Sequence, residues 1–189
     1  MERHPQIQSL LAHPISRRGF LSRSAGAGAL LVVVGCAGDG GKDYAVLLDP
    51  GERPVSLPVR EFAVLKAVAR RLVPGGAGYP GAEDLGVTSR IDRELSFHPA
   101  RLSIDLRDAL RLIEWWPLAT HLARFTRLGG EQQDAVLGNM AASRFALLRA
   151  ALQGIKTLVM FFHYTQEPTW PAIGYDGPWV ARVPPESLA

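Results

Sequence analysis

Cysteine is almost absent from this chain of 189 residues, because Cys36 is the only one. A single thiol cannot form an intramolecular disulfide, and it cannot supply the thiolate ligands of a zinc site or an iron–sulfur cluster. The chain also has no Cys-x-x-Cys-His motif, which excludes covalent attachment of a c-type haem. Any such centre that works together with this chain must therefore be held by another protein.

An excess of charge of one sign is also missing once the first 35 residues are set aside. The formal net charge of the chain is +3, and residues 1–35 carry all of it, with four arginines against Glu2. Residues 36–189 contain 17 basic and 17 acidic side chains. Such a balanced chain has no basic field to attract phosphate groups, so nucleic acid is not expected as a partner.

The apolar stretch near the N-terminus is too short to cross a membrane. Residues 24–35 are only 12 uncharged residues, whereas a hydrocarbon core of about 30 Å needs about 20. The stretch follows adjacent arginines and ends at small residues, which is the order of an export signal. The arginine pair resembles a twin-arginine signal, which is recognised by a translocase that carries folded proteins. The predicted signal residues are Arg17, Arg18, Phe20 and Leu21.

The residues that end this stretch, 33–36 (VVGC), resemble a lipobox. In a lipobox the cysteine thiol is diacylated, and the cysteine becomes the new N-terminus after cleavage. Two acyl chains hold a protein on a membrane, whereas one chain gives only marginal binding. The alternative is a cleaved leader without lipid on the cysteine. We predict a signal peptide over residues 1–36 and a periplasmic protein that is anchored to a membrane through Cys36.

The rest of the chain divides into a tether and a helical domain. Residues 37–56 are polar and rich in glycine and proline, which predicts a flexible tether before a domain over 57–189. Ser56 is the expected N-cap of the first helix, with Pro58 in its first turn and a stop at Pro74. Apolar residues at spacings of three and four predict further helices over about 87–97, 101–116, 117–125, 131–142 and 144–164.

No segment alternates polar and apolar residues with a period of two. The predicted fold is therefore all-α: a compact bundle of five to six helices with an irregular aromatic C-terminal segment. The last helix is expected to be buried on nearly all sides, because Leu158 and Phe161 widen its apolar stripe.

The C-terminal segment after Tyr164 is irregular and aromatic. Residues 165–179 contain three prolines and two glycines, which exclude a regular helix. Their large aromatic side chains must either cover the bundle or meet a partner. Its part from Trp170 to Trp179 is nearly uncharged, with Asp176 alone, a composition that suits the centre of an interface. The predicted partner interface is Trp170, Ile173, Gly174, Tyr175, Gly177, Pro178 and Trp179.

No motif in the chain indicates an active site. The glycine clusters at 26–28 and 38–41 do not open a βαβ unit, which argues against a dinucleotide site. His121 and His163 are interpreted as partly buried imidazoles with satisfied hydrogen bonds. Three carboxylates are interpreted as parts of solvated helix faces: Asp92, Asp105 and Asp108. No catalytic, cofactor-binding or metal-binding residue is predicted.

Two alternatives to a non-catalytic role stay open at this point. The chain could be a metal-dependent enzyme in which carboxylates act with His98 or His163. It could also be a stand-alone exported lipoprotein that binds a ligand.

Several motifs of the helical part resemble the gluconate 2-dehydrogenase subunit 3 family. They are residues 57–62 (LPVREF), residues 67–74 (AVARRLVP), and a closing W-x-x-I-G-Y-x-G-P pattern over 170–178. The resemblance covers about residues 57–180, and members commonly begin with a twin-arginine leader.

The resemblance implies a small, non-catalytic subunit of a membrane-associated dehydrogenase complex. Its partner would be a large flavoprotein of the glucose–methanol–choline type, which binds FAD and oxidises a sugar, a sugar acid or another alcohol. A cytochrome subunit, of the c type, would accept the electrons. The small subunit would assist export and maturation of the large one, and the family offers no catalytic residues to assign here.

Overall fold

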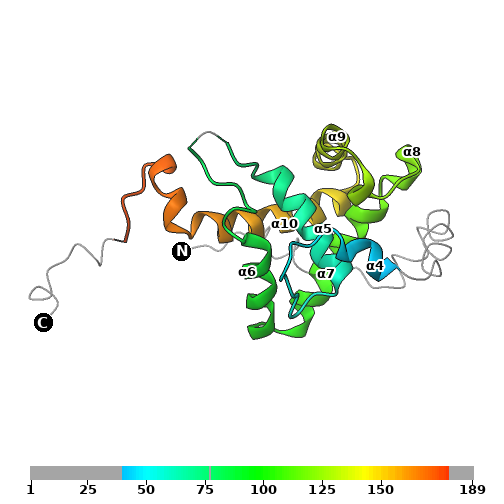
Figure 1. Cartoon of the computed structure of the whole chain (residues 1–189). Helices are drawn as coiled ribbons and strands as arrows, with labels where there is room; N and C mark the ends of the chain where they lie inside the picture. The colour runs from blue at the N-terminus through cyan, green and yellow to red at the C-terminus, as the bar shows by residue number, and fades with distance from the viewer. Residues whose placement is uncertain (1–39, 77, 179–189) are drawn as a thin grey trace, which may run out of the picture. The chain divides into compact units, whose positions relative to one another are not determined.

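The structure is a computed structural model that describes residues 40–76 and 78–178 (Figure 1). Over these residues the chain forms seven α-helices and no strand, which confirms the predicted all-α fold. The helices, with the short 3-10 helices written η, are α4 (Gly40–Ala45), α5 (Val59–Leu72), α6 (Val87–Glu94), η1 (Leu95–Phe97), α7 (Ala100–Trp115), α8 (Leu118–His121), η2 (Phe125–Arg127), α9 (Gly130–Ala141), α10 (Ala146–Tyr164), η3 (Glu167–Thr169) and η4 (Pro171–Ile173).

Helices α5 and α10 form the centre of the core. Helix α5 contacts α6, α7, α9 and α10, and its Phe62, Leu65 and Val68 are at most 1% exposed. Helix α10 contacts α5, α6, α7 and α9. Its buried face, called the buried stripe below, consists of Leu148, Leu152, Ile155 and Val159. Because each such side chain contributes about 1.5–3 kcal/mol when fully buried, these two helices hold most of the fold together.

The start of α5 differs from the predicted one. The helix begins at Val59 with Pro58 at its N-cap position, and no side chain caps it. Ser56 is not the N-cap, because its backbone is used by other partners. Its N–H donates to Asp92, and its C=O accepts a hydrogen bond from Arg107 at 2.8 Å.

The predicted fourth helix is much shorter than expected. Helix α8 has four residues, and Leu122, which was expected on its apolar face, is 90% exposed. Leu122 has a φ of 52°, in the left-handed region that a bulky side chain rarely adopts. The chain turns away here because Phe125, in η2, is fully buried, and η2 packs against α5, α7 and α9.

The described part of the predicted tether is folded against the helices. Tyr44, in α4, is 1% exposed, and its hydroxyl donates to Glu114 of α7 at 2.8 Å. Lys66 of α5 forms ion pairs of 2.7 Å with both Asp49 and Glu52. Residues 43–56 are therefore a docked segment and not a free linker, because specific side-chain contacts bind them to α5 and α7.

No single helix among the described residues is both long enough and apolar enough to cross a bilayer. Helices α9 and α10 reach the required length and composition only as a pair, and a bend of 118° separates them.

Candidate functional site

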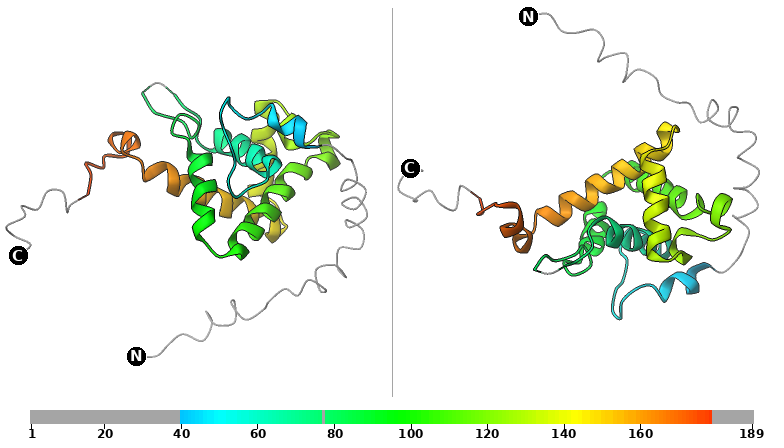
Figure 2. Two further views of the ribbon diagram at one scale, coloured as in Figure 1. Left: turned by 60° about the horizontal axis from the view of Figure 1, so that its bottom comes forward. Right: turned by 90° about the horizontal axis from the view of Figure 1, so that it is seen from above.

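Helix α10 has a second apolar face that the described chain leaves largely uncovered. Leu147 is 50% exposed and Phe161 is 60% exposed, and Phe145, just before the helix, is 51% exposed. The prediction that this helix is buried on nearly all sides is therefore wrong. Part of the reason is visible in Figures 1 and 2, where the C-terminal end of α10 extends beyond the other helices and so has few elements to pack against.

The exposed face follows one side of the helix in a regular pattern. It is called the outer stripe here and consists of Leu147, Ala150, Gly154, Leu158 and Phe161, of which Leu158 is half-buried against the core and the others are exposed. The spacing of three and four residues aligns these positions on one face, and none of them is charged. A Cβ atom added at Gly154 would meet no atom within 4 Å, so the chain itself does not require a glycine there. The outer stripe is thus apolar and shallow in the middle.

The irregular segment that follows the helix, residues 165–178, is called the aromatic arm here. Trp170 lies against Tyr175 with ring centroids 5.1 Å apart, and its indole N–H donates to the Tyr164 carbonyl at 3.2 Å. Within the described chain, no apolar side chain beyond Phe162 belongs to the core or packs against it. The aromatic arm therefore packs on the end of α10 and on itself, and it does not cover the bundle.

The predicted interface residues take different positions within the arm. Ile173 is 50% exposed and Tyr175 is 39% exposed, and Gly174 and Pro178 are also exposed. Gly174 and Gly177 have φ values of 68° and 101°, so both turns use the left-handed region that favours glycine. Gly177 is buried against the Trp170 ring, and a Cβ there would lie 3.5 Å from it.

Several predicted residues lie outside the part of the chain that the structure describes. They are Arg17, Arg18, Phe20, Leu21, Cys36 and Trp179.

A buried histidine joins the base of the arm to the loop between α5 and α6. His163 is fully buried, and its Nε2 is 2.8 Å from the Tyr79 hydroxyl of that loop, while its Nδ1 has no hydrogen-bond partner. Burial lowers the pKa of His163 below its ordinary value of 6.5. The interpretation of a fully satisfied imidazole is thus correct for one ring nitrogen only. The contact stabilises the loop against the last turn of α10.

The buried carboxylates of the body bind parts of the chain to one another. Asp92 is 1% exposed and accepts hydrogen bonds from the backbone N–H groups of Val55, Ser56 and Leu57. Asp92 is therefore not part of a solvated helix face. Its buried carboxylate is stabilised by these three backbone N–H groups, which have no other acceptor in a helix or strand. Asp105 and Asp108 are exposed, as predicted, and pair with arginines of their own helix.

Two further glutamates are buried with their partners. Glu114 accepts hydrogen bonds from Tyr44 and Thr126, and burial raises its pKa despite these partners. Burial alone would also raise the pKa of Glu61, but hydrogen bonds from Arg60 and Arg111 outweigh it and lower that pKa. Both carboxylates are used to hold helices together.

No cluster suited to a metal ion is found within residues 40–76 and 78–178. His98 is exposed, and its Nδ1 lies 2.9 Å from the carbonyl of Glu94 in the preceding turn. His163 contacts aromatic rings, with Tyr79 and Tyr164 centroids 5.4 and 5.2 Å away. The two histidines named in the metal-enzyme alternative are therefore not brought together with carboxylates.

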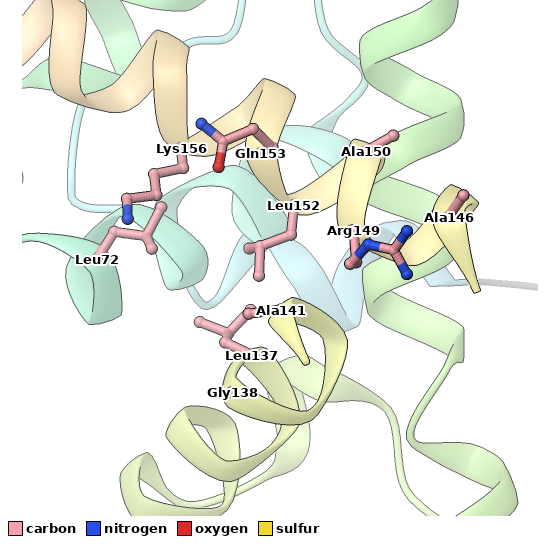
Figure 3. A pocket seen from close by; sticks show the side chains of 10 residues that line it. All are labelled: Leu72, Leu137, Gly138, Ala141, Ala146, Arg149, Ala150, Leu152, Gln153 and Lys156. Carbon is pink, nitrogen blue, oxygen red and sulfur yellow. The ribbon is translucent and has the colours of Figure 1, made fainter. Parts of the chain in front are cut away.

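A groove runs between α9 and α10 near the end of α5 (Figure 3). Its volume is about 630 Å³, and its walls are mainly leucine and alanine side chains. Figure 3 shows Lys156 beside Leu72 at one end and Arg149 beside Ala146 at the other. The Arg149 guanidinium donates to the Ser143 carbonyl, so it is held in place at the edge of the groove.

The fold and the exposed surface together define an all-helical domain with an uncovered apolar face and an aromatic arm. The family model described as gluconate 2-dehydrogenase subunit 3 matches residues 59–177, which is α5 through nearly the whole arm. The chain therefore belongs to the gluconate 2-dehydrogenase subunit 3 family, whose description makes it a subunit of a dehydrogenase complex. The search of curated proteins gave no match, and neither did the search of solved structures.

The outer stripe was missed by sequence reasoning, although the sequence contains a signal for it. Residues 147, 150, 154, 158 and 161 repeat at spacings of three and four, in parallel with the buried stripe. Two such stripes on one helix indicate either full burial or a second, intermolecular contact. The irregular arm after the helix favours the intermolecular contact, because a chain that does not fold back over α10 leaves the end of the helix uncovered.

Proposed function

We propose that this chain is the non-catalytic small subunit of a periplasmic, membrane-associated flavoprotein dehydrogenase. The partner is a large subunit of the glucose–methanol–choline type that binds FAD and oxidises a sugar, a sugar acid or another alcohol. A c-type cytochrome accepts the electrons. This chain assists the export and maturation of the large subunit, carries the twin-arginine signal for both, and is anchored to the membrane through Cys36.

One observation carries the proposal: the chain belongs to a dehydrogenase subunit family and leaves apolar side chains exposed along α10 and in the aromatic arm. The surface combines the outer stripe with the aromatic arm, which meet where Phe161 and Tyr164 are both exposed. Exposed apolar patches of this kind mark sites of protein–protein contact. Aromatic side chains supply most of the binding energy in such contacts.

The composition of α10 supports a protein partner at this surface. The outer stripe has no charge, and the two cations of the helix, Arg149 and Lys156, line the groove, which adjoins the stripe at Ala150. Uncharged apolar positions are typical of the desolvated centre of an interface, with charged positions at its rim. We infer that the large subunit packs along the outer stripe and against the arm.

Co-purification of the two subunits tests the proposal. The large subunit is co-expressed with a tagged form of this chain that has either Phe161→Ser or Ile173→Ser, two changes at exposed positions. An interface residue that contributes about 2 kcal/mol weakens binding roughly 30-fold when it is truncated. We expect each variant to lose most of the co-purified flavoprotein and to keep the melting temperature of the unmodified chain.

Phe97→Ser is the matched control, because Phe97 is 82% exposed but lies on η1, outside the proposed surface. It should retain the flavoprotein. Equal retention by all three variants would contradict the proposed surface. Absence of a co-purifying flavoprotein with the unmodified chain would contradict the proposed function itself.

A further inference from the structure

The short helix α8 ends in an exposed leucine that the fold does not explain. Leu122 is 90% exposed, and within the described chain it is the one residue other than glycine with a positive φ. A left-handed backbone at a bulky residue costs roughly 1–2 kcal/mol. Because the Leu122 side chain is 90% exposed, it gains almost no packing energy that could offset this cost in the isolated chain. A strained, exposed apolar residue of this kind indicates a contact that lies outside the chain.

Other exposed apolar and basic side chains lie close to this position along the chain, or contact such residues. Trp116, just before α8, is 39% exposed, and its ring packs edge-on against Phe145, which is 51% exposed. The Arg144 guanidinium lies 4.9 Å from the Phe145 ring centroid, and the Arg127 side chain is 61% exposed. These five residues, Trp116, Leu122, Arg127, Phe145 and Arg144, are called the α8 patch.

The α8 patch combines the side chains that favour the surface of a bilayer. Tryptophan and other aromatic residues partition to the interface between lipid and water, and arginine binds anionic headgroups. The charged residues of the patch, Arg127 and Arg144, are both exposed, and Asp43 is the one carboxylate that pairs with either of them among the described residues, so the local charge favours anionic lipid.

The place where the N-terminal segment docks puts this patch close to the predicted lipid anchor. Asp43, in the first turn of α4, pairs with Arg124 at 3.2 Å and with Arg127 at 2.7 Å. Only six residues lie between Cys36 and Asp43, and these seven residue steps reach at most about 25 Å when fully extended. A body of about 140 residues is roughly 35 Å across by the usual scaling of size with length. Because this reach is shorter than the width of the body, the side of the body where Asp43 lies must stay close to the lipid.

We propose that the α8 patch rests on the phospholipid bilayer, with the Leu122 side chain inserted among the headgroups. The inference rests on the proposed anchoring at Cys36. It adds an orientation: the side formed by α4, α8 and η2 faces the membrane. In every view of Figures 1 and 2, α8 and the arm at the end of α10 lie at opposite ends of the body. The aromatic arm is thus held away from the bilayer, where the large subunit has room to bind.

The test uses the acylated protein and one added cysteine. Diacylation blocks the thiol of Cys36, so Leu122→Cys provides a single reactive thiol for an environment-sensitive fluorophore. The labelled chain is reconstituted in vesicles of phosphatidylethanolamine and phosphatidylglycerol that contain a nitroxide-labelled lipid. We expect strong quenching of the fluorophore at position 122. Phe97→Cys, at an equally open position on η1, should show several-fold less.

Two outcomes would overturn the inference. One is equal quenching at positions 122 and 97. The other is shielding of the label at 122 by the large subunit in the absence of vesicles, which would make the α8 patch a protein interface. Mass spectrometry of the mature chain tests the anchor separately. If Cys36 carries no lipid, the Cys36→Ser chain is instead tethered to nickel-chelating vesicles by a histidine tag that precedes residue 37. Stronger quenching at position 122 than at position 97 then supports the proposed orientation, and equal quenching contradicts it.

Discussion

At the scale of single residues, the buried ionisable groups of this chain act as bonds between distant segments. Asp92 of α6 binds the backbone just before α5, and Glu114 of α7 binds both α4 and η2. Each carboxylate accepts several hydrogen bonds, which offsets the free energy of removing its charge from water. Their burial therefore follows from the fold, and it does not by itself indicate catalysis.

His163 makes the stability of the body depend on pH. Burial holds its pKa below the ordinary value of 6.5, so the folded protein binds fewer protons at this site than the unfolded chain. The contribution of neutral, buried His163 to the free energy of unfolding is therefore complete above about pH 6.5, and it is lost as the pH falls towards the lowered pKa. We expect the melting temperature of the unmodified chain to fall more between pH 7 and pH 5 than that of His163→Gln, as measured by circular dichroism.

The exposed His98 supplies the control for this prediction. His98→Gln removes a histidine from an exposed position, where the side chain bonds only to its own helix turn, and so shows the effect of losing a histidine that is not buried. Parallel curves for the unmodified chain and His163→Gln would contradict the assigned role of burial.

At the scale of elements, α10 is a core helix that also serves as the docking helix in the proposed complex. Glycine in a helix interior costs about 1 kcal/mol relative to alanine, and Gly154 has open space around it. Gly154→Ala should therefore raise the free energy of unfolding by up to about 1 kcal/mol in urea titration. Gly154→Trp should fold equally well but weaken binding of the large subunit more than tenfold, because the indole would keep the partner away from the outer stripe.

Gly138 in α9 provides the matched comparison. It also lies mid-helix with nothing within 4 Å of an added Cβ, but it lines the groove and not the outer stripe. Gly138→Trp should leave binding intact. If Gly154→Trp binds the large subunit as well as Gly138→Trp does, the outer stripe is not the contact surface.

The longer helices of the fold could be predicted from sequence because local signals and tertiary packing agree there. Helices α5, α7, α9 and α10 lie within about two residues of their expected positions, since apolar spacing and terminal proline or glycine specify them. Helix α8 could not be predicted, because burial of Phe125 overrides the apolar spacing of Leu118 and Leu122. Docking of α4 depends on Glu114, which is 70 residues away from Tyr44, and local pattern gives no signal for such a contact.

The candidate surface was predictable in part. Proline, glycine and tryptophan identified the aromatic arm, because these residues exclude a helix and favour contact. The outer stripe was assigned to the interior instead, since periodicity reports that a face is apolar and not what covers it. Whether another element packs on that face depends on where the neighbouring helices end, and this is a property of the whole fold.

At the scale of the whole molecule, the leader and the body have separate roles in the proposed complex. We expect Arg17→Lys with Arg18→Lys to retain both this chain and its large subunit in the cytoplasm. Lysine keeps the charge but lacks the planar guanidinium that the translocase is expected to recognise. Cell fractionation with immunoblotting of both subunits measures the outcome. A large subunit that is still exported in the double variant has an address of its own.

The docked N-terminal segment also determines where mechanical tension enters the protein. A pull on the leader reaches the body first at Asp43 and Tyr44, which are bound to α7 and η2. Glu114 joins these two elements through Thr126, so the load is shared between them before it reaches the central helix α5. A force on the leader therefore moves the body as one unit, because it acts on side chains that are tied into the core.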